Sequence, residues 1–324
     1  MLAAKRSISL NGKEITRTPV LLPSFSSKGF PKINDILELS KEFIANYLLI
    51  SAYDIHYKNI KSPIDFTELI FLDSGGYECS KDSEFAELGY LPYDSKEWNI
   101  SYYKKVLESW KNDTPTVLIS YDHPKERCSI PEQVDRAKEL FKGRKDAIIE
   151  MLIKPETQYQ KYVQVDEVLR NAHALSDFGI IGFTEKELGK NLLDRMVNIA
   201  RIRTKLTKCG INCPIHIFGS LDTISTPLYY LAGADIFDGL TWLRFAYMNG
   251  QTAYIQSYVA LELGIKIRDD MAPAQIWWRN YNYLTDLELQ MRTYLNAREF
   301  KSFKYHSGFL ENSFQSMKAE LEGD

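Results

Sequence analysis

Short runs of apolar residues recur along the chain, and longer amphipathic or charged segments separate them. No run approaches the ~18 apolar residues that a membrane helix needs. Continuous apolar runs of this length are typical of strands that are buried on both faces of a parallel sheet. Eight such runs occur, at residues 19–25, 46–51, 69–74, 116–122, 147–153, 178–183, 214–220 and 234–240.

Segments with the spacing of amphipathic helices lie between several of these runs, notably residues 130–143 and 186–206. Strands that alternate with helices form a parallel sheet covered by the helices, and eight such units close into a barrel. The pattern therefore predicts an α/β fold of the (β/α)8 TIM-barrel type. At 324 residues, the whole chain, 1–324, fits a single TIM-barrel domain.

Two segments depart from the regular alternation. Residues 79–115, after the third run, are rich in loop-forming residues, and we interpret them as an insertion that serves either as a lid or as a packed aromatic cluster. The aromatic residues of this segment are Tyr90, Tyr93, Trp98, Tyr102 and Tyr103. Residues 252–324 are helical in pattern, and we expect them to supply the last barrel helix and a C-terminal helical cover.

Composition and charge narrow the class of protein. The chain is 44% hydrophobic and 13% aromatic, which is typical of a globular protein whose aromatic rings fill a core or stack on bases. The net charge of −3 excludes a general attraction to polyanions, so contact with a nucleic acid would need a local basic patch. The basic run Arg201, Arg203, Lys205 and Lys208 precedes the seventh strand, and we interpret it as a solvated face at the bottom of the barrel.

The four cysteines follow no C-x-x-C pattern, which favours reduced thiols in a cytoplasmic protein. No N-terminal apolar stretch resembles a signal peptide, and we expect no association with a membrane. Cys209, Cys213 and His216 lie close together in CGINCPIH, but a fourth ligand is not evident. We therefore predict no metal site there.

Three carboxylates stand at the ends of predicted strands. Asp73, Asp122 and Asp238 end the third, fourth and eighth runs. In a TIM barrel the active site lies at the carboxyl ends of the strands. A single aspartate in such a position is often only a helix cap or a turn residue. Three aspartates on one rim indicate an active site.

The order of several motifs resembles the tRNA-guanine transglycosylase superfamily, including its DNA-acting 7-deazaguanine relatives. The motifs are TPVLLPS, DSGGY, a strand that ends in Asp122, FGIIGF, IFGS and GADIFDGL. The resemblance runs from about Thr18 to Gly250 and resumes weakly near Asn280. It implies a barrel enzyme that cleaves the N-glycosidic bond of a nucleotide within a polymer.

The resemblance also implies a role for each matching residue. Asp238 matches the nucleophile that attacks the anomeric carbon of the sugar, and Asp73 matches the general acid and base. Tyr77 matches the ring that stacks on the bound base. Asp122 matches a carboxylate that hydrogen-bonds the edge of the base, and Gly182 a backbone contact on the other side of the pocket.

Further candidates lie beside these positions. Arg244 matches an arginine that binds the nucleic-acid backbone, and we expect it at a helix N-terminus that favours phosphate. Phe183 follows Gly182 and is included among the base-binding residues. Secondary candidates are Ser74 in the glycine turn, Tyr53 after the second strand, and His123 beside Asp122, where it could orient an acid or a base.

The chemistry of glycosidic cleavage agrees with paired carboxylates. The transition state resembles an oxocarbenium ion, which an ionised carboxylate stabilises or attacks. A second carboxylic acid protonates the departing base, because a base anion leaves poorly. The glycines after Asp73 let the backbone approach a flat ligand, and Tyr77 offers the ligand a π-face. A stacked base is out of reach, so the nucleotide must be flipped or single-stranded.

The sequence also departs from the family. No cysteine follows Cys213, and Arg279-Asn280 stands where the family has a His-Asn pair, so the zinc site is absent and no cofactor is expected. Lys154 replaces a base-reading glutamine, and Ser51 to Asp54 replace an Asn-Thr-Tyr-His segment. Guanine specificity therefore cannot be carried over. Lys154 favours an acceptor-rich or differently decorated base, or else it is a solvated loop lysine.

Three classes of function remain. The first is a glycosylase that excises a modified base from DNA, with base exchange on DNA or tRNA as its alternative. Loss of the zinc module favours DNA over tRNA, and roles in genome modification or in defence against modified phage DNA would fit both outcomes. The second is a non-catalytic nucleic-acid-binding subunit, which would be expected to lose Asp238. A homodimer is possible in every case. The third, a hydrolase of small glycosides, leaves the basic and aromatic residues after Asp238 unexplained.

Overall fold

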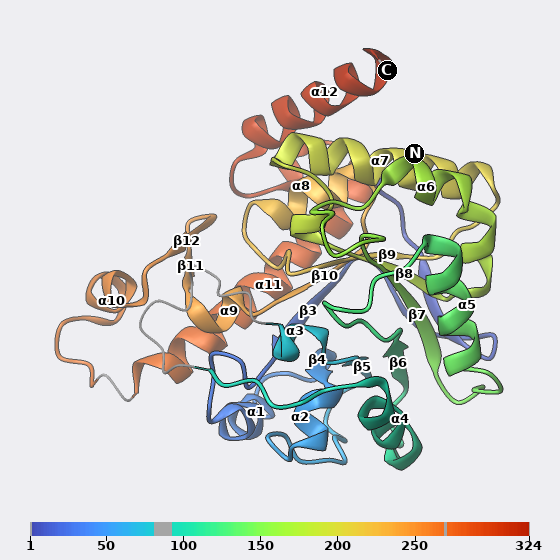
Figure 1. Cartoon of the computed structure of the whole chain (residues 1–324). Coiled ribbons are helices and arrows are strands. Elements are labelled where there is room, and N and C mark those ends of the chain that lie inside the picture. The colour runs from blue at the N-terminus through green and yellow to red at the C-terminus, as the bar shows by residue number, and fades with distance from the viewer. Residues whose placement is uncertain (1, 81–92, 269–270, 324) are drawn as a thin grey trace.

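A closed barrel of eight parallel strands forms the centre of the molecule in a computed structural model, which describes residues 2–80, 93–268 and 271–323 (Figure 1). Each strand coincides with one of the eight apolar runs, β8 extending one residue beyond its run to Thr184, and the predicted (β/α)8 TIM barrel is confirmed. The strands are β3 (Val20–Phe25), β4 (Tyr47–Ser51), β5 (Leu69–Asp73), β6 (Thr116–Ile119), β7 (Ile148–Ile153), β8 (Ile180–Thr184), β9 (Ile215–Phe218) and β10 (Ile236–Gly239).

Helices surround the barrel (Figure 1). The α-helices are α1 (Ile33–Ser40), α2 (Ala52–His56), α3 (Gly76–Cys79), α4 (Ile100–Ser109), α5 (Ile130–Leu140), α6 (Val165–Arg170), α7 (Leu192–Lys208), α8 (Ser225–Ala232), α9 (Thr241–Arg244), α10 (Ile255–Tyr258), α11 (Ala272–Ala297) and α12 (Ser307–Gly323). Short 3-10 turns are η2 (Ala172–Asp177), η3 (Glu185–Glu187) and η5 (Phe300–Ser302), and η4 (Val259–Leu263) is a π turn.

Side-chain caps set where the two predicted helices begin. The Ser129 hydroxyl accepts the N–H of Glu132 at the start of α5, where Pro131 occupies the first turn. The predicted segment 186–206 starts as a helix only at Leu192, because the Asn191 side chain accepts the N–H of Asp194 at 2.8 Å and caps α7 there. The preceding residues form η3 instead.

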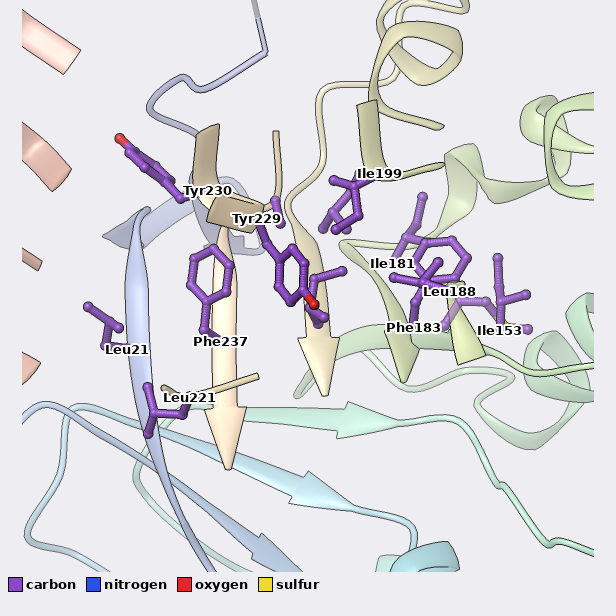
Figure 2. Close-up of a cluster of buried hydrophobic side chains, with 14 of the residues drawn as sticks. Leu21, Ile153, Ile181, Phe183, Leu188, Ile199, Leu221, Tyr229, Tyr230 and Phe237 are labelled. Carbon is purple, nitrogen blue, oxygen red and sulfur yellow. The ribbon is translucent and has the colours of Figure 1, made fainter. Parts of the chain in front are cut away.

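Alternate residues of the strands face two different cores, because successive side chains of a strand point to opposite faces. One set fills the inside of the barrel, including Val20, Leu22, Leu49, Phe71 and Ile119. The other set packs against the helices, including Leu21, Ile153, Ile181, Phe183 and Phe237 (Figure 2). This alternation decides which residues can reach a cavity inside the barrel mouth.

An antiparallel hairpin that the apolar pattern did not predict lies before the first barrel strand. Strands β1 (Ser7–Leu10) and β2 (Lys13–Arg17) form it, and Ile8, Leu10 and Ile15 join the core inside the barrel. Only one or two side chains of each short strand are apolar, which gives a weaker signal than the continuous barrel runs.

A buried ion-pair network lies at the amino end of β10. Asp235 accepts from Arg6 at 2.7 Å and from Arg203 at 2.6 Å, and all three side chains are almost completely buried. The prediction that Arg203 belongs to a solvated basic face is therefore wrong. Arg203 also donates to the carbonyl oxygens of Gly233 and Cys213, each at 3.0 Å. The network joins the N-terminal segment, helix α7 and the last barrel strand.

The two segments outside the regular alternation are more structured than the pattern indicated. Residues 100–109 of the expected insertion form α4, whose Tyr103 hydroxyl donates to the carbonyl of Ile119 on β6. Residues 81–92, which include Tyr90, lie outside the described residues. The C-terminal segment begins with a hairpin of β11 (Ala246–Met248) and β12 (Gln251–Ala253), seen at the left of Figure 1 with α10, where a helical pattern was expected from Thr252.

Replacing Asp235 with Asn should destabilise the fold by about 3–5 kcal/mol, because two buried guanidinium groups lose their counter-charge. Urea unfolding measures this change. The matched control is Asp166→Asn, which breaks the exposed pair that Arg201 of the same helix α7 makes at 2.6 Å. That variant should lose about 0–1 kcal/mol. Equal effects of the two substitutions would show that the buried network adds no more than a surface pair.

Candidate active site at the carboxyl ends of the barrel strands

A cavity of about 260 Å³ opens at the carboxyl ends of the barrel strands. Seven residues that the sequence predicted line it: Asp73, Ser74, Tyr77, Asp122, Lys154, Asp238 and Arg244. Four other candidates, Tyr53, His123, Gly182 and Phe183, are not among its lining residues. The three aspartates at the strand ends therefore share one cavity.

The turn after Asp73 has no room for side chains. Gly75 has a φ of +93°, and a Cβ atom at this position would lie 2.8 Å from the indole nitrogen of Trp98. A Cβ atom at Gly76 would lie 2.8 Å from Oδ2 of Asp122. The Ser74 hydroxyl accepts the N–H of Asp122 at 3.0 Å. The Ser-Gly-Gly sequence thus brings the loops after β5 and β6 into direct contact.

Asp73 ends β5 and points into the barrel mouth, in the same alternate set as Leu69 and Phe71. Its Oδ2 accepts the N–H of Gly75 at 3.0 Å. Burial raises the pKa of Asp73 to about 6; the Gly75 N–H lowers the pKa in part, and the negative charges of Asp122 and Asp238 act with burial to raise it. A carboxyl group that carries a proton near neutral pH is suited to general acid catalysis.

Asp238 lies on β10 and is held by contacts to the two neighbouring strands, β3 and β9 with the residue that follows it. Its Oδ2 accepts the Ser24 hydroxyl at 2.7 Å, and its Oδ1 accepts the N–H of Gly219 at 3.0 Å. The Nε2 atom of His216 lies 3.3 Å from Oδ1. Donors on both oxygens and a nearby imidazole are the surroundings expected of an ionised carboxylate.

His216 connects Asp238 to a second buried acid, Glu150. The Nδ1 atom of His216 lies 2.8 Å from Oε1 of Glu150, and both side chains are completely buried inside the barrel. Burial alone would lower the pKa of His216, but the two carboxylates outweigh it and raise the pKa to about 9. Burial also raises the pKa of Glu150, which the His216 charge partly offsets.

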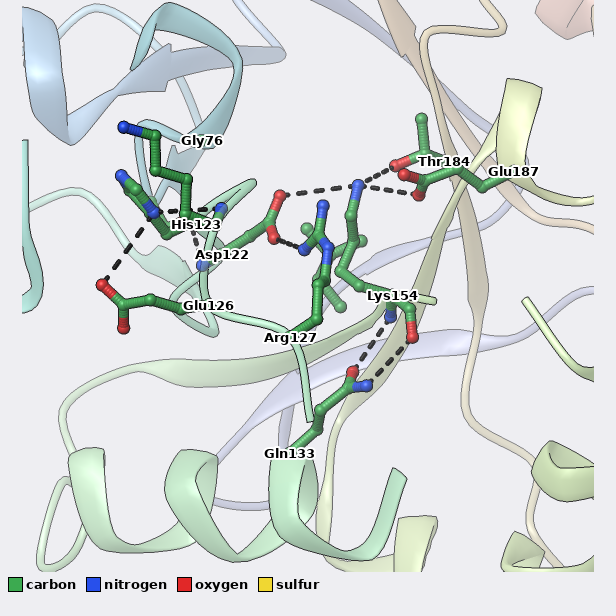
Figure 3. A network of polar contacts seen from close by, with 12 residues as sticks. Gly76, Asp122, His123, Glu126, Arg127, Gln133, Lys154, Thr184 and Glu187 are labelled. Carbon is green, nitrogen blue, oxygen red and sulfur yellow. Dashed lines mark hydrogen bonds and ion pairs between the residues drawn. The ribbon is translucent and has the colours of Figure 1, made fainter. Parts of the chain in front are cut away.

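Asp122 belongs to a network of ion pairs on one wall of the cavity (Figure 3). Its carboxylate pairs with Arg127 and, at 3.4 Å, with Nζ of Lys154. Burial acts to raise the pKa of Asp122, but these two cations outweigh it and lower the pKa. The pKa of Asp122 is therefore shifted in the opposite direction to that of Asp73.

Lys154 bridges two loops rather than projecting into solvent. Its ammonium group lies 2.7 Å from Glu187 and donates to the Thr184 hydroxyl at 2.8 Å, and its side chain is 11% exposed. The interpretation of Lys154 as a solvated loop lysine is therefore wrong. The residue also lines a second cavity of about 340 Å³ between the barrel and helices α4 and α5, whose wall it shares with Asp122 and Arg127.

Tyr77 and Arg244 meet at another side of the cavity. Arg244 donates from Nη2 to the Tyr77 hydroxyl at 2.9 Å, and the ammonium of Lys28 lies 4.5 Å from the centre of the Tyr77 ring. Arg244 is the last residue of α9, so the expected position at a helix N-terminus is wrong. Arg244 and Lys28 are thus two cations in contact with Tyr77, of which Arg244 lines the cavity.

The four candidates that do not line the cavity contact other parts of the protein instead. Phe183 is completely buried between the barrel and the helices, because it points out of the barrel one residue after Gly182 (Figure 2). A Cβ atom at Gly182 would lie 2.6 Å from both Glu150 and the Phe218 ring. The Tyr53 hydroxyl accepts the N–H of Lys96, and the His123 ring stacks on Tyr121.

The alternation of strand residues is the signal that could have found Glu150 and His216. Glu150 lies two residues before the inward-facing Leu152, and His216 lies two residues before the inward-facing Phe218. Both side chains therefore point into the barrel. A charged side chain in such a position requires a partner across the barrel. The sequence analysis grouped His216 instead with Cys209 and Cys213. Within the described residues, no cluster of His, Cys, Asp and Glu could hold a metal ion.

Glu78 is a second acid that the sequence analysis missed. It lines the cavity, is 2% exposed, and accepts hydroxyl hydrogen bonds from Ser26 at 2.5 Å and from Ser51 at 2.7 Å. Burial raises the pKa of Glu78 to about 8, and the charges of Asp54 and Asp73 add to the increase. Its position directly after DSGGY gave no sign of burial.

Comparison of the chain with models of known protein families and with curated protein sequences finds no match. The search for membrane-spanning helices, made on the described part of the chain, found none of sufficient length and apolar character. A function must therefore be argued from the chemistry of the site.

Replacing Glu78 with Gln should change how stability depends on pH. Because the folded pKa of Glu78 is raised, its contribution to stability is complete below about pH 4.5 and is lost as the pH rises through about 8. The free energy of unfolding of the wild type, minus that of Glu78→Gln, should fall by about 1.4 kcal/mol per pH unit across this window. Urea unfolding at pH 5, 6.5 and 8 tests this. A constant difference would mean that the carboxyl group titrates normally.

Proposed function

We propose that this protein is a relative of the tRNA-guanine transglycosylases that cleaves the N-glycosidic bond of a modified base in DNA. The observation that carries the proposal is one cavity lined by two carboxyl groups in different electrostatic environments. Asp238 has hydrogen-bond donors on both oxygens and a facing imidazole, whereas burial and like charge raise the pKa of Asp73 to about 6. The DSGGY and GADIFDGL motifs support the same assignment.

In the first chemical step, a carboxylate oxygen of Asp238 forms a bond to the anomeric carbon of the sugar. The bond between that carbon and the base breaks, and its electron pair moves to the base nitrogen. The proton on Asp73 passes to the departing base, which leaves Asp73 ionised. Two acids with different environments can divide these roles between them.

In the second step, the covalent bond to Asp238 is broken by an incoming nucleophile. If water attacks the anomeric carbon, Asp73 accepts its proton, and the product is an abasic site. If a free base attacks, the product carries a new base. We favour excision, because exchange requires recognition of both the departing and the arriving base, and the loop residues that the resemblance assigns to recognition are changed at Lys154 and at residues 51–54.

The charges around the cavity support a nucleic-acid substrate in a flipped or single-stranded form. Tyr77 offers a ring for stacking, and the cations Arg244 and Lys28 beside it suit contact with a phosphate backbone. Elsewhere in the cavity lining, Asp122 and Lys154 present an acceptor and a donor that suit the hydrogen-bonding edge of a base. The missing zinc motif favours DNA over tRNA.

Replacing Asp238 with Asn should abolish base release, because an amide neither attacks the anomeric carbon nor stabilises its positive charge. Release is measured by mass spectrometry of the free base, with circular dichroism to verify the fold. The matched control is Asp222→Asn, an aspartate of the loop between β9 and α8 whose Oδ1 accepts the N–H of Ile224. Base release at the normal rate by Asp238→Asn would refute the assignment, and binding without release by the wild type would favour the non-catalytic subunit.

Replacing Asp73 with Asn should lower the rate of base release by about 10²–10⁴. In the wild type, release should decline as the pH rises above about 6, because the proton that Asp73 donates is then lost. The variant should lack this decline. Rates measured between pH 5 and 8 for both proteins test the role. A wild-type rate that stays constant across this range would exclude Asp73 as the acid.

The substrate can be identified by incubating the protein with genomic DNA, phage DNA and bulk tRNA, with and without free 7-deazaguanine bases. Mass spectrometry then shows which base enters solution and which base, if any, enters the polymer. We expect a free modified base and abasic DNA. Incorporated base would indicate exchange, and release from tRNA alone would overturn the choice of DNA.

A further inference from the structure

We propose that Glu150 and His216 form a charged support beneath Asp238, in which His216 is a positioning residue that holds the carboxylate ionised and speeds its departure from the covalent intermediate. The catalytic part of this inference rests on the proposed function. The charged state of the support does not, and it can be tested without a substrate. Neither residue belongs to the motifs from which the function was argued.

The geometry confines the imidazole of His216 between two carboxylates. Its Nδ1 lies 2.8 Å from Glu150 on β7, and its Nε2 lies 3.3 Å from Asp238 on β10. The ring stacks on Phe218, with centroids 3.9 Å apart, and meets the edge of Phe71. With apolar rings on the remaining sides and no exposed surface, the imidazole has no freedom to turn away from either acid.

The charges that face the ring favour its protonated form. They come from Glu150 and Asp238, while Phe71 on β5 and Phe218 on β9 contribute none. Gly182 on β8 allows the close approach, because a Cβ atom there would lie 2.6 Å from Oε1 of Glu150 and displace it. A neutral imidazole would leave two carboxylates buried near each other with no compensating charge. An imidazolium reduces the net charge of the three groups to −1.

An imidazolium beside the nucleophile acts differently on its two chemical states. It stabilises the Asp238 carboxylate, which is an anion, but gains little from the glycosyl ester, which is neutral. The ester is therefore less stable relative to the free carboxylate. When the incoming nucleophile attacks the anomeric carbon, the electron pair of the ester bond returns to Asp238, and the imidazolium stabilises the charge that develops there.

A purely structural ion pair would predict a different set of results. It would give a loss of stability on substitution, with no change in the pH profile of the reaction and no change in the amount of covalent intermediate. Glu150→Gln is the informative variant, because it keeps the shape of the side chain and a hydrogen-bonding oxygen but removes the charge that faces Nδ1 of His216.

The first experiment measures the charge of His216 by nitrogen NMR of protein labelled in its five histidines. His216→Asn assigns the signal of the buried ring. We expect an imidazolium at pH 7.5 in the wild type and loss of the proton at a lower pH in Glu150→Gln. A neutral His216 ring at pH 7.5 in the wild type would overturn the inference, whatever the activity of the protein.

The second experiment measures the covalent intermediate on denaturing gels, with end-labelled DNA from which the wild type releases a base. His216→Asn should raise the fraction of covalently linked protein several-fold between pH 5.5 and pH 8. Glu150→Gln should do the same at pH 8 and approach the wild type at pH 5.5, where the imidazole regains its proton. Unchanged intermediate and unchanged profiles in both variants would refute the positioning role.

The control is Tyr230→Phe, which removes a buried hydrogen bond to the Met291 carbonyl in the outer core and should leave both readouts unchanged. It separates a specific effect on Asp238 from a general loss of buried polar contacts. If the wild type releases no base from any DNA or RNA, the proposed function fails, while the NMR result still decides whether the charged support exists.

Discussion

The pairing of β10 with β3 closes the barrel, and the position of every group in the site depends on that closure. The register sets Asp238 opposite Leu22 and Gly239 opposite Pro23. This register places Ser24 beside both residues. Its hydroxyl donates to Asp238 and accepts the N–H of Gly239 at 3.1 Å. A shift of one residue would turn Asp238 toward the helices and Phe237 into the cavity. The position of the Asp238 carboxylate thus depends on the pairing of the first and last strands of the barrel.

The distribution of cations distinguishes carboxyl groups that the strand ends bring together. Asp122 has Arg127 and Lys154 as partners, and its pKa is lowered. Asp73 has no cation among the causes of its shift, and its pKa is raised. Glu78, deeper in the wall, has hydroxyl donors and acidic neighbours and has a still higher pKa. Acids of one chemical kind therefore carry protons to different degrees at the same pH, which a reaction with both an acid and a nucleophile requires.

The sequence was sufficient to predict the eight strands and the shared rim, because continuous apolar runs and terminal aspartates are local signals. It was insufficient where a side chain's role depends on a partner far along the chain. Arg203 looked solvated because nothing near it indicates Asp235, and His216 looked like part of a cysteine cluster because Glu150 lies 66 positions away. Phe183 is a different case. Its outward direction follows from the two-residue period of the strand, counted from its inward neighbours.

The Ser-Gly-Gly turn constrains how this site could change its range of ligands. A side chain at position 75 or 76 would collide with Trp98 or Asp122, so that edge of the cavity is fixed in shape. The adjoining wall is formed by side chains from separate loops, with Lys154 between Asp122 and Glu187. Divergence or engineering of specificity would therefore proceed through substitutions around Lys154. The backbone at Gly75 and Gly76 would keep its shape.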